Sequence, residues 1–297
     1  MSAREPDPRI VAAFDTTRGR HLKTVLAGGT FRLGTGAGLV AGVGVGVAVA
    51  GLPGALVGLV AVSIVALVIA FAVASSRAKH DFWTAFAASL GMTYVGSTKL
   101  PETTPILSAG DRCSCRDWMH GTGDDGRAFG LGNYTYQTRE RNADGKGYHY
   151  DDHDYTLATV EVAGADECFV RALSLRTHRR NKLTRLLGQD SVGALTMENL
   201  ATESAAFDDR YDLMIEKDGD AVRVLEVFTP AFIARLAQHP LEPYFDYRSG
   251  TLVVFVPGHS NEAVEFTALL ECAREIAGRF REEVDESLRA TGSAAPR

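Results

Sequence analysis

A stretch of forty-four residues, 33–76, contains no Asp, Glu, Lys, Arg or His. One membrane-spanning helix needs about 20 apolar residues to cross about 30 Å of hydrocarbon, so this stretch is long enough for two crossings. Pro53 and Gly54 interrupt it near the middle, where they end one helix and reverse the chain. The sequence therefore predicts a transmembrane hairpin with spans at 33–51 and 55–75.

The first predicted span has a glycine at every fourth position, and the register continues into the second span: Gly34, Gly38, Gly42, Gly46 and Gly58. Residues four apart share one face of a helix, and a face of bare backbone lets a second helix approach closely. We expect this glycine zipper to pack against the second span of the same hairpin. A homo-oligomer seam through the same face is the alternative.

The charges on either side of the predicted hairpin set its orientation. Residues 1–32 carry six Lys or Arg, Arg77 and Lys79 follow the second span, and the connecting turn has no charge. Because Lys and Arg stay on the cytoplasmic side, we expect a multi-pass protein of the cell (inner) membrane with both termini in the cytoplasm. The predicted parts are a cytoplasmic segment (1–32), the hairpin in the lipid bilayer (33–76), a cytosolic domain (77–290) and a tail (291–297).

The predicted cytosolic domain is acidic. Residues 78–297 carry 24 Lys and Arg against 34 Asp and Glu, a net charge of −10. A domain with this charge repels phosphate backbones, so no nucleic-acid partner is predicted. Its cysteines are expected to be reduced in the cytosol, and no disulfide scaffold is predicted.

The pattern after residue 100 favours an α+β fold with a mainly antiparallel sheet. Three pairs of β-rich runs are each joined by a polar or glycine-containing turn, which predicts three hairpins. The paired runs are 127–138 with 155–162, 211–215 with 221–228, and 244–247 with 251–256. Residues 252–256 are all apolar, which predicts a central strand buried on both faces.

Helices are expected at 79–90, after Thr177, after Thr229-Pro230, and at 261–290, where threonine N-caps begin the middle two. The last helix carries a stripe at alternating four- and three-residue spacing: Phe266, Leu270, Ala273, Ala277, Phe280 and Val284. Packing across the sheet explains this stripe, and a coiled-coil dimer is the alternative.

Three short motifs stand in this domain: ESAAFDDRY at 203–211, LEVFTPAF at 225–232, and the pair Tyr134 and Tyr136. Together they resemble a family of bacterial, actinobacterial-type, membrane proteins defined only as a domain of unknown function. In that family a two-helix transmembrane hairpin precedes a cytosolic α+β domain. The resemblance implies this architecture and brings no activity, cofactor or site residue with it.

His149, Asp151 and His153 alternate along a predicted strand, which places all three on one face. Imidazole and carboxylate groups at this spacing can bind a divalent metal. The alternative is that they are solvated polar residues at the end of a hairpin.

Two other groups have metal-binding or anion-binding chemistry. Cys113 and Cys115, with His120 and Cys168, could hold zinc, but a CxC pair without a second pair is a poor zinc signal. A basic cluster predicts a solvated helix face, or a surface for lipid headgroups or an acidic partner: Arg176, His178, Arg179, Arg180, Lys182 and Arg185.

The sequence contains no GxSxG, HExxH, P-loop or kinase-like motif, so no catalytic residue and no cofactor are predicted. We expect an integral membrane protein whose cytosolic domain is a non-catalytic binding or scaffold module for an unknown protein partner. Two alternatives remain. One is a metal-dependent enzyme that uses the segment from His149 to Asp154, and the other is a small oligomeric channel or transport accessory built from the glycine-rich spans.

Overall fold

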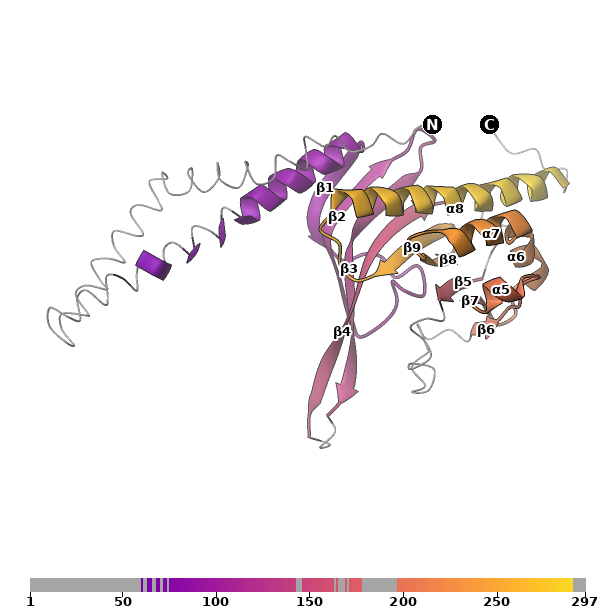
Figure 1. The fold of residues 1–297 in the computed structure, drawn as a ribbon, viewed down its shortest axis with the longest axis horizontal. Helices are drawn as coiled ribbons and strands as arrows, with labels where there is room; N and C mark the ends of the chain where they lie inside the picture. Colours follow the sequence, from indigo (N-terminus) through magenta and orange to yellow (C-terminus); the bar gives the residue numbers. More distant parts are fainter. Residues whose placement is uncertain are drawn as a thin grey trace. The chain divides into compact units, whose positions relative to one another are not determined.

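The computed structural model describes residues 60, 63–65, 68–69, 72–73, 75–142, 146–162, 164, 169, 171–177 and 197–290. These residues fall into two compact units, which meet in the sequence between Ser89 and Leu90. Figure 1 shows the helices and strands of both units.

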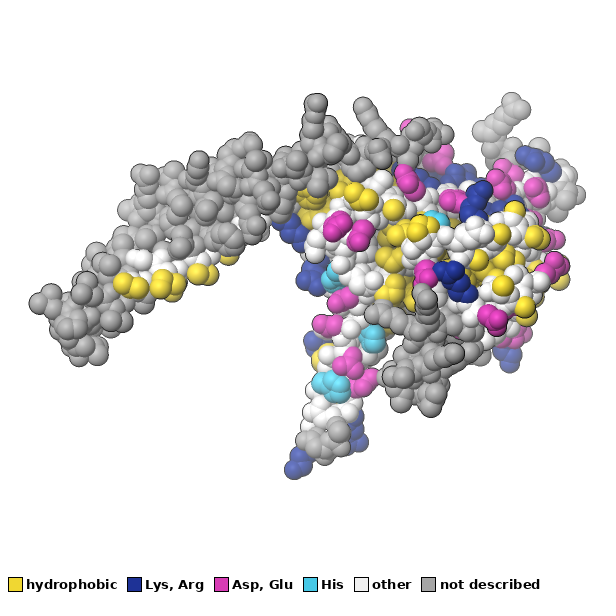
Figure 2. Space-filling model, in the orientation of Figure 1, with side chains coloured by type: hydrophobic (Ala, Val, Ile, Leu, Met, Phe, Trp, Pro, Cys, Tyr) yellow, Lys and Arg dark blue, Asp and Glu magenta, His cyan; other side chains and the backbone are white. Residues whose placement is uncertain are grey.

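The unit that ends at Ser89 contains a helix over 75–89, close to the predicted helix at 79–90. The predicted span 33–51 with Gly34, Gly38, Gly42 and Gly46 lies outside the described residues, as do Gly58 and much of the span 55–75. The described residues between 60 and 73 are helical. Their large apolar side chains are exposed (Figure 2): Val60, Ile64, Val65, Val68, Ile69 and Val73. Within the described residues, no helix is both long enough and apolar enough to cross a bilayer.

The unit from Leu90 onward is an α+β domain built on an antiparallel sheet, as predicted. Nine described strands follow the spatial order β1-β2-β3-β4-β9-β8-β5-β7-β6, and all neighbours are antiparallel. The strands are β1 (Met92–Thr98), β2 (Arg112–Thr122), β3 (Ala128–Arg141), β4 (Tyr148–Glu161), β5 (Leu173–Thr177), β6 (Met197–Asn199), β7 (Tyr211–Glu216), β8 (Tyr244–Arg248) and β9 (Thr251–Pro257). The helices of this unit are α5 (Ala205–Asp208), α6 (Ala221–Val227), α7 (Pro230–Gln238) and α8 (Ala263–Ala290).

Strand β9 is the central strand that the apolar run 252–256 predicts. It lies between β4 and β8, and Leu252, Val253, Val254 and Phe255 are buried on both of its faces. The β8–β9 hairpin has Arg248 opposite Thr251, which leaves Ser249 and Gly250 as its turn. Both turn residues take a positive φ, as a tight two-residue hairpin requires.

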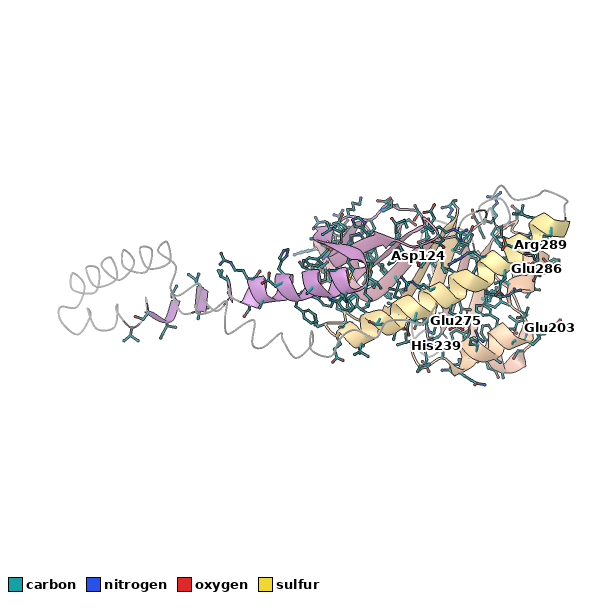
Figure 3. The ribbon with its side chains drawn as sticks, turned by 90° about the horizontal axis from the view of Figure 1, so that it is seen from above. Asp124, Glu203, His239, Glu275, Glu286 and Arg289 are labelled. Atoms are coloured by element: carbon teal, nitrogen blue, oxygen red, sulfur yellow. The ribbon has the colours of Figure 1, made fainter. Side chains whose placement is uncertain are left out.

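Helix α8 covers one face of the sheet. Figure 3 shows it lying across the strands, with Glu275, Glu286 and Arg289 labelled along its length. The six residues of the predicted stripe are all buried, and Phe280 stacks on Tyr247 of β8 with ring centroids 5.1 Å apart. The stripe therefore packs on the sheet, as predicted, and is not left exposed for a coiled coil. Helix α7 is also confirmed, with Thr229 as its N-cap and Pro230 at its start.

The loop over 99–111 covers the opposite face. Asp246 precedes Tyr247 on β8 and so points away from α8, where its Oδ2 accepts a hydrogen bond of 2.6 Å from Ile106 N. Tyr134 of β3 donates from Oη to the carbonyl oxygens of Ile106 and Leu107, at 3.3 and 3.2 Å. Both faces of the central sheet are thus buried.

The predicted strand at 221–228 is wrong, because residues 221–227 form helix α6. Asp218 and Gly219 do make a turn after β7, but Asp220 then caps a helix by accepting a hydrogen bond from Arg223 N at 3.1 Å. Val224 and Val227 are buried one helical turn apart, whereas Val222 is 70% exposed. The valines therefore follow helical spacing, and the cap outweighs the hairpin signal.

Strands β1 and β2 were not predicted. The pairing of β2 with β3 shifts register between Arg116 and Met119, and Asp117 within that bulge has a positive φ of 54°. A bulge interrupts the two-residue alternation by which a strand is recognised. The helix predicted after Thr177 lies outside the described residues, and Thr177 itself is the last residue of β5.

Candidate functional site: the projecting β3–β4 ribbon

The two longest strands continue beyond the rest of the sheet (Figure 1). Strands β3 and β4 pair from Phe129 and Val160 out to Arg141 and Tyr148. In contrast, β2 pairs with β3 only as far as Gln137, and β9 pairs with β4 only from Tyr155 inward. Residues 138–141 and 148–151 therefore form a two-stranded projection, here called the β3–β4 ribbon, next to which no further strand lies among the described residues.

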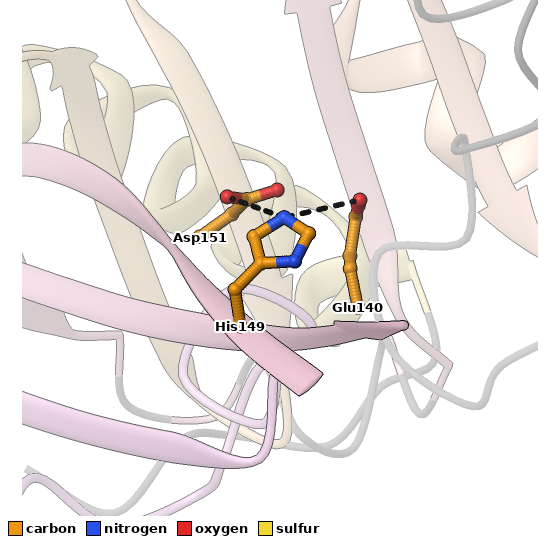
Figure 4. A group of neighbouring side chains, drawn as sticks. All are labelled: Glu140, His149 and Asp151. Atoms are coloured by element: carbon orange, nitrogen blue, oxygen red, sulfur yellow. Dashed lines mark ion pairs between the residues drawn. The ribbon is translucent and has the colours of Figure 1, made fainter. Parts of the chain in front are cut away.

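One face of the ribbon brings together an imidazole and two carboxylates (Figure 4). His149 Nε2 lies 3.4 Å from Asp151 Oδ1 and 3.9 Å from Glu140 Oε2. The other ring nitrogen, Nδ1, lies 3.1 Å from Asn142 Oδ1. One ligand atom from each of Glu140, His149 and Asp151 lies within 4.8 Å of the others.

The sequence predicted two of these three residues. His149 and Asp151 share a face as expected, but Glu140 of β3 was missed. The length of the segment 142–147 could have predicted it, because six residues between the two strands place residue 140 directly opposite residue 149. His153 is on the same face, but its Nε2 is 2.9 Å from Thr138 Oγ1 and its ring stacks on Tyr136 at 4.6 Å. His153 therefore extends the aromatic packing of the core and does not join the group of Glu140, His149 and Asp151.

The opposite face of the ribbon carries aromatic rings capped by arginines. The Arg139 guanidinium lies 3.7 Å from the centre of the Tyr148 ring, and that of Arg112 lies 4.3 Å from the centre of the Tyr150 ring. Tyr148 is 55% exposed and Tyr150 is 38% exposed. Figure 2 shows basic, acidic and histidine side chains along the ribbon.

A hydrogen-bonded polar network fixes the base of the ribbon beside α8. Asp154 Oδ1 accepts from Thr135 Oγ1 at 2.7 Å and lies 3.2 Å from His259 Nε2. One step inward, Asn133 accepts from Thr156 Oγ1 at 3.1 Å and donates to the Ser260 carbonyl at 2.8 Å. These bonds hold the segment that leads from β9 into α8.

The network ends at the bulge in β2. Asn133 Nδ2 lies 3.4 Å from Asp117 Oδ2, and Tyr94 Oη donates to Asp117 Oδ1 at 3.2 Å. Burial, with the neighbouring Asp117 carboxylate as the second cause, raises the pKa of Tyr94 to about 12. The bulge thus directs the Asp117 carboxylate toward the sheet, where it accepts hydrogen bonds from Tyr94 of β1 and Asn133 of β3.

The cysteines that were weighed as zinc ligands do not converge in the described part of the chain. Cys115 is buried and Cys113 is half-buried, and neither joins a convergent group of ligand atoms there. Burial raises the pKa of Cys115, which opposes the thiolate form that binds metal. Cys168 lies outside the described residues.

The basic cluster is corrected at Arg176, the one member that the structure describes. Arg176 lies in β5, with its side chain 8% exposed, and pairs with Asp246 Oδ1 at 2.7 Å. Its guanidinium also lies 4.7 Å from the centre of the Phe255 ring. It is therefore a core residue and not part of a solvated helix face, since the tertiary structure brings Asp246 to it from β8.

A hollow of about 350 Å³ lies where β5, β7 and α6 meet. Its charged lining consists of Arg171, Arg223, Asp218 and Asp220, so the two signs are balanced. Ala172 N donates to Glu216 Oε2 at 3.0 Å at this end of β7. The described lining contains two aspartates and two arginines and no histidine, cysteine or serine.

Fold and site together define an α+β domain on an antiparallel sheet of nine described strands, with a projecting two-stranded ribbon that carries exposed polar side chains. No family model matches the chain. The crystal structure of the mycobacterial trehalose monomycolate transport factor A, TtfA, is similar over 70% of this chain and 95% of that chain, at 11% sequence identity and a TM-score of 0.43. A likeness at this level carries no argument about function.

Proposed function

We propose that this chain is a membrane-anchored, non-catalytic binding module whose α+β domain binds a protein partner through the β3–β4 ribbon. The observation that carries the proposal is the ribbon itself, which continues past β2 and β9 and has no adjoining strand among the described residues. A strand without a neighbour is a template for pairing with another chain. Partner proteins commonly use such edges by adding a strand of their own.

The side chains of the ribbon support this role. Tyrosine and arginine are enriched at the residues that contribute most to protein–protein binding, because they combine a large apolar contact with polar groups. Tyr148 and Tyr150 present exposed rings, and Arg139 and Arg112 lie against them. This arrangement offers a preformed contact surface on an element that extends away from the sheet.

The burial of the cysteine thiols Cys115 and Cys272 supports a non-catalytic role. Burial raises the pKa of Cys115 and Cys272, which disfavours the nucleophilic thiolate. The polar groups at the base of the ribbon are hydrogen-bonded to one another across the sheet. Such bonds fix the loop that begins α8.

The membrane anchor is supported by the charge-free stretch 33–76 and by the exposed apolar side chains between Val60 and Val73. Exposed valine and isoleucine side chains of this density need an apolar environment. We propose that this environment is the lipid bilayer, with both termini in the cytoplasm. Packing of the glycine zipper within the hairpin or between copies stays a prediction.

Site-specific photo-crosslinking in cells of the native host tests the ribbon as the contact. A photoreactive phenylalanine analogue replaces Tyr150 in the full chain, and the same analogue replaces Glu286 on α8 as an exposed control. We expect a discrete adduct with one identified protein from position 150 and not from position 286. The same adducts from both positions, or none from position 150, would contradict the proposal.

A further inference from the structure

We infer that the β3–β4 ribbon binds a divalent transition-metal ion, with Zn²⁺ as the best fit, through Glu140, His149 and Asp151. This inference goes beyond the proposed function and does not depend on it. The three residues come from both strands, Glu140 from β3 and the other two from β4. A bound ion would therefore fasten the two strands of the ribbon to each other.

The distances fit a metal better than direct hydrogen bonds. A ligand–zinc distance of about 2.1 Å in tetrahedral geometry places neighbouring ligand atoms about 3.4 Å apart. His149 Nε2 is 3.4 Å from Asp151 Oδ1 and 3.9 Å from Glu140 Oε2. Small rotations of exposed side chains on the ribbon are enough to close this geometry around an ion.

A second observation concerns the tautomer of His149. Asn142 Nδ2 donates to the Lys146 carbonyl at 2.9 Å, which fixes the amide so that its Oδ1 faces His149 Nδ1 at 3.1 Å. An amide oxygen only accepts, so Nδ1 is the donor in this contact and Nε2 is the ring nitrogen that faces the two carboxylates. Metal-binding histidines are oriented in this way by an acceptor on the other ring nitrogen.

The three facing atoms, one imidazole nitrogen and two carboxylate oxygens, each have a lone pair that a metal ion can accept. The guanidinium groups of Arg139 and Arg112 lie over Tyr148 and Tyr150, on the opposite face of the ribbon. The ligand spacing and the Asn142 contact support a metal ion at this cluster.

The donor set selects the class of ion. One imidazole nitrogen and two carboxylate oxygens suit zinc and neighbouring transition metals, whereas calcium and magnesium prefer sites made of oxygen alone with more ligands. Three protein ligands leave at least one coordination position for water or a group from elsewhere. His153 is excluded from the set by its contacts with Thr138 and Tyr136.

Titration of Zn²⁺ alone into the untagged full chain, purified in mild detergent and followed by calorimetry, tests the inference. We expect one site per chain, weakened about tenfold or more by His149→Gln, Glu140→Gln and Asp151→Asn, and also by Asn142→Ala, which removes the orienting acceptor. His153→Gln is the matched control on the same face and should bind Zn²⁺ as the original chain does.

Two results would overturn the inference. One is an original chain that binds Zn²⁺ no more tightly than His149→Gln does. The other is a loss of affinity in His153→Gln as large as in His149→Gln, which would place the site elsewhere. Because the titration contains no partner, either result would leave the photo-crosslinking test of the ribbon unaffected.

Discussion

Arg176 and Asp246 form an ion pair of 2.7 Å inside the domain, with side chains 8% and 0% exposed. Asp246 also accepts from Ile106 N and from Ser174 Oγ, so one carboxylate joins β5, β8 and the loop over 99–111. The Nη2 atom of Arg176 is buried and has no hydrogen-bond partner. The Arg176–Asp246 pair therefore helps to position the loop over 99–111, and one N–H donor group of Arg176 stays unsatisfied.

Removing one member of this pair should strongly destabilise the domain. Asp246→Asn leaves the Arg176 charge buried without its counter-charge, and we expect a loss of about 3–5 kcal/mol in the free energy of unfolding. Urea denaturation of the full chain measures it. The exposed pair Arg235 and Glu275 is the control, since Glu275→Gln should cost no more than about 1 kcal/mol. Equal losses in the two variants would contradict the structural role of Asp246.

A glycine in β3 makes room for a tryptophan of β2. A Cβ on Gly130 would overlap the Trp118 ring, and one on Gly132 would lie 2.7 Å from Cys115 Sγ. Because overpacking of a core costs about 1–3 kcal/mol, Gly130→Ala should lower the urea midpoint by a corresponding amount. Gly278 of α8 has no neighbouring atom within 4 Å of its added Cβ, so Gly278→Ala should instead stabilise by about 0.5–1 kcal/mol. Two alanine variants with the same effect would show that the Trp118 contact is not formed.

Two tyrosines with raised pKa values, one buried and one half-buried, should make the domain sensitive to alkali. Burial is the main cause that raises the pKa of Tyr94 and of Tyr211 to about 12, from an ordinary value of 10. Below pH 10 both tyrosines are protonated in the folded and in the unfolded chain, so their ionisation does not change the free energy of unfolding. Between pH 10 and pH 12 the unfolded chain loses the protons while the folded chain keeps them, so the free energy of unfolding falls as pH rises. Thermal unfolding across this range measures the slope, and Tyr94→Phe should reduce it. An unchanged slope in that variant would show that Tyr94 ionises freely in the folded domain.

The elements that the sequence predicts correctly are those with strong local signals. The apolar run of β9, the Thr229-Pro230 start of α7 and the buried stripe of α8 each specify their structure within a few residues. Contacts with residues distant in the sequence did not change the structure of these three elements. Local pattern was therefore enough to obtain the fold class.

One error arises from a local helix cap, and the others arise where contacts between distant segments decide. The N-cap at Asp220 turned a valine-rich run into α6, and the bulge at Asp117 hid β2. Arg176 belongs to the core only because β8 brings Asp246 beside it. In the candidate metal cluster, Glu140 depends on the strand register across a turn, which composition does not reveal.

The affinity of the full chain for the partner identified by crosslinking shows whether the β3–β4 ribbon is the binding surface. The decisive variant is Tyr148→Ser with Tyr150→Ser, compared with Val264→Ser, which removes an exposed apolar side chain from α8. If the ribbon is the contact, the double variant should lose about 2 kcal/mol or more of binding free energy, and the α8 variant should bind as the original chain does. Unchanged affinity in the double variant, or an equal loss in both variants, would show that the partner does not bind through the β3–β4 ribbon.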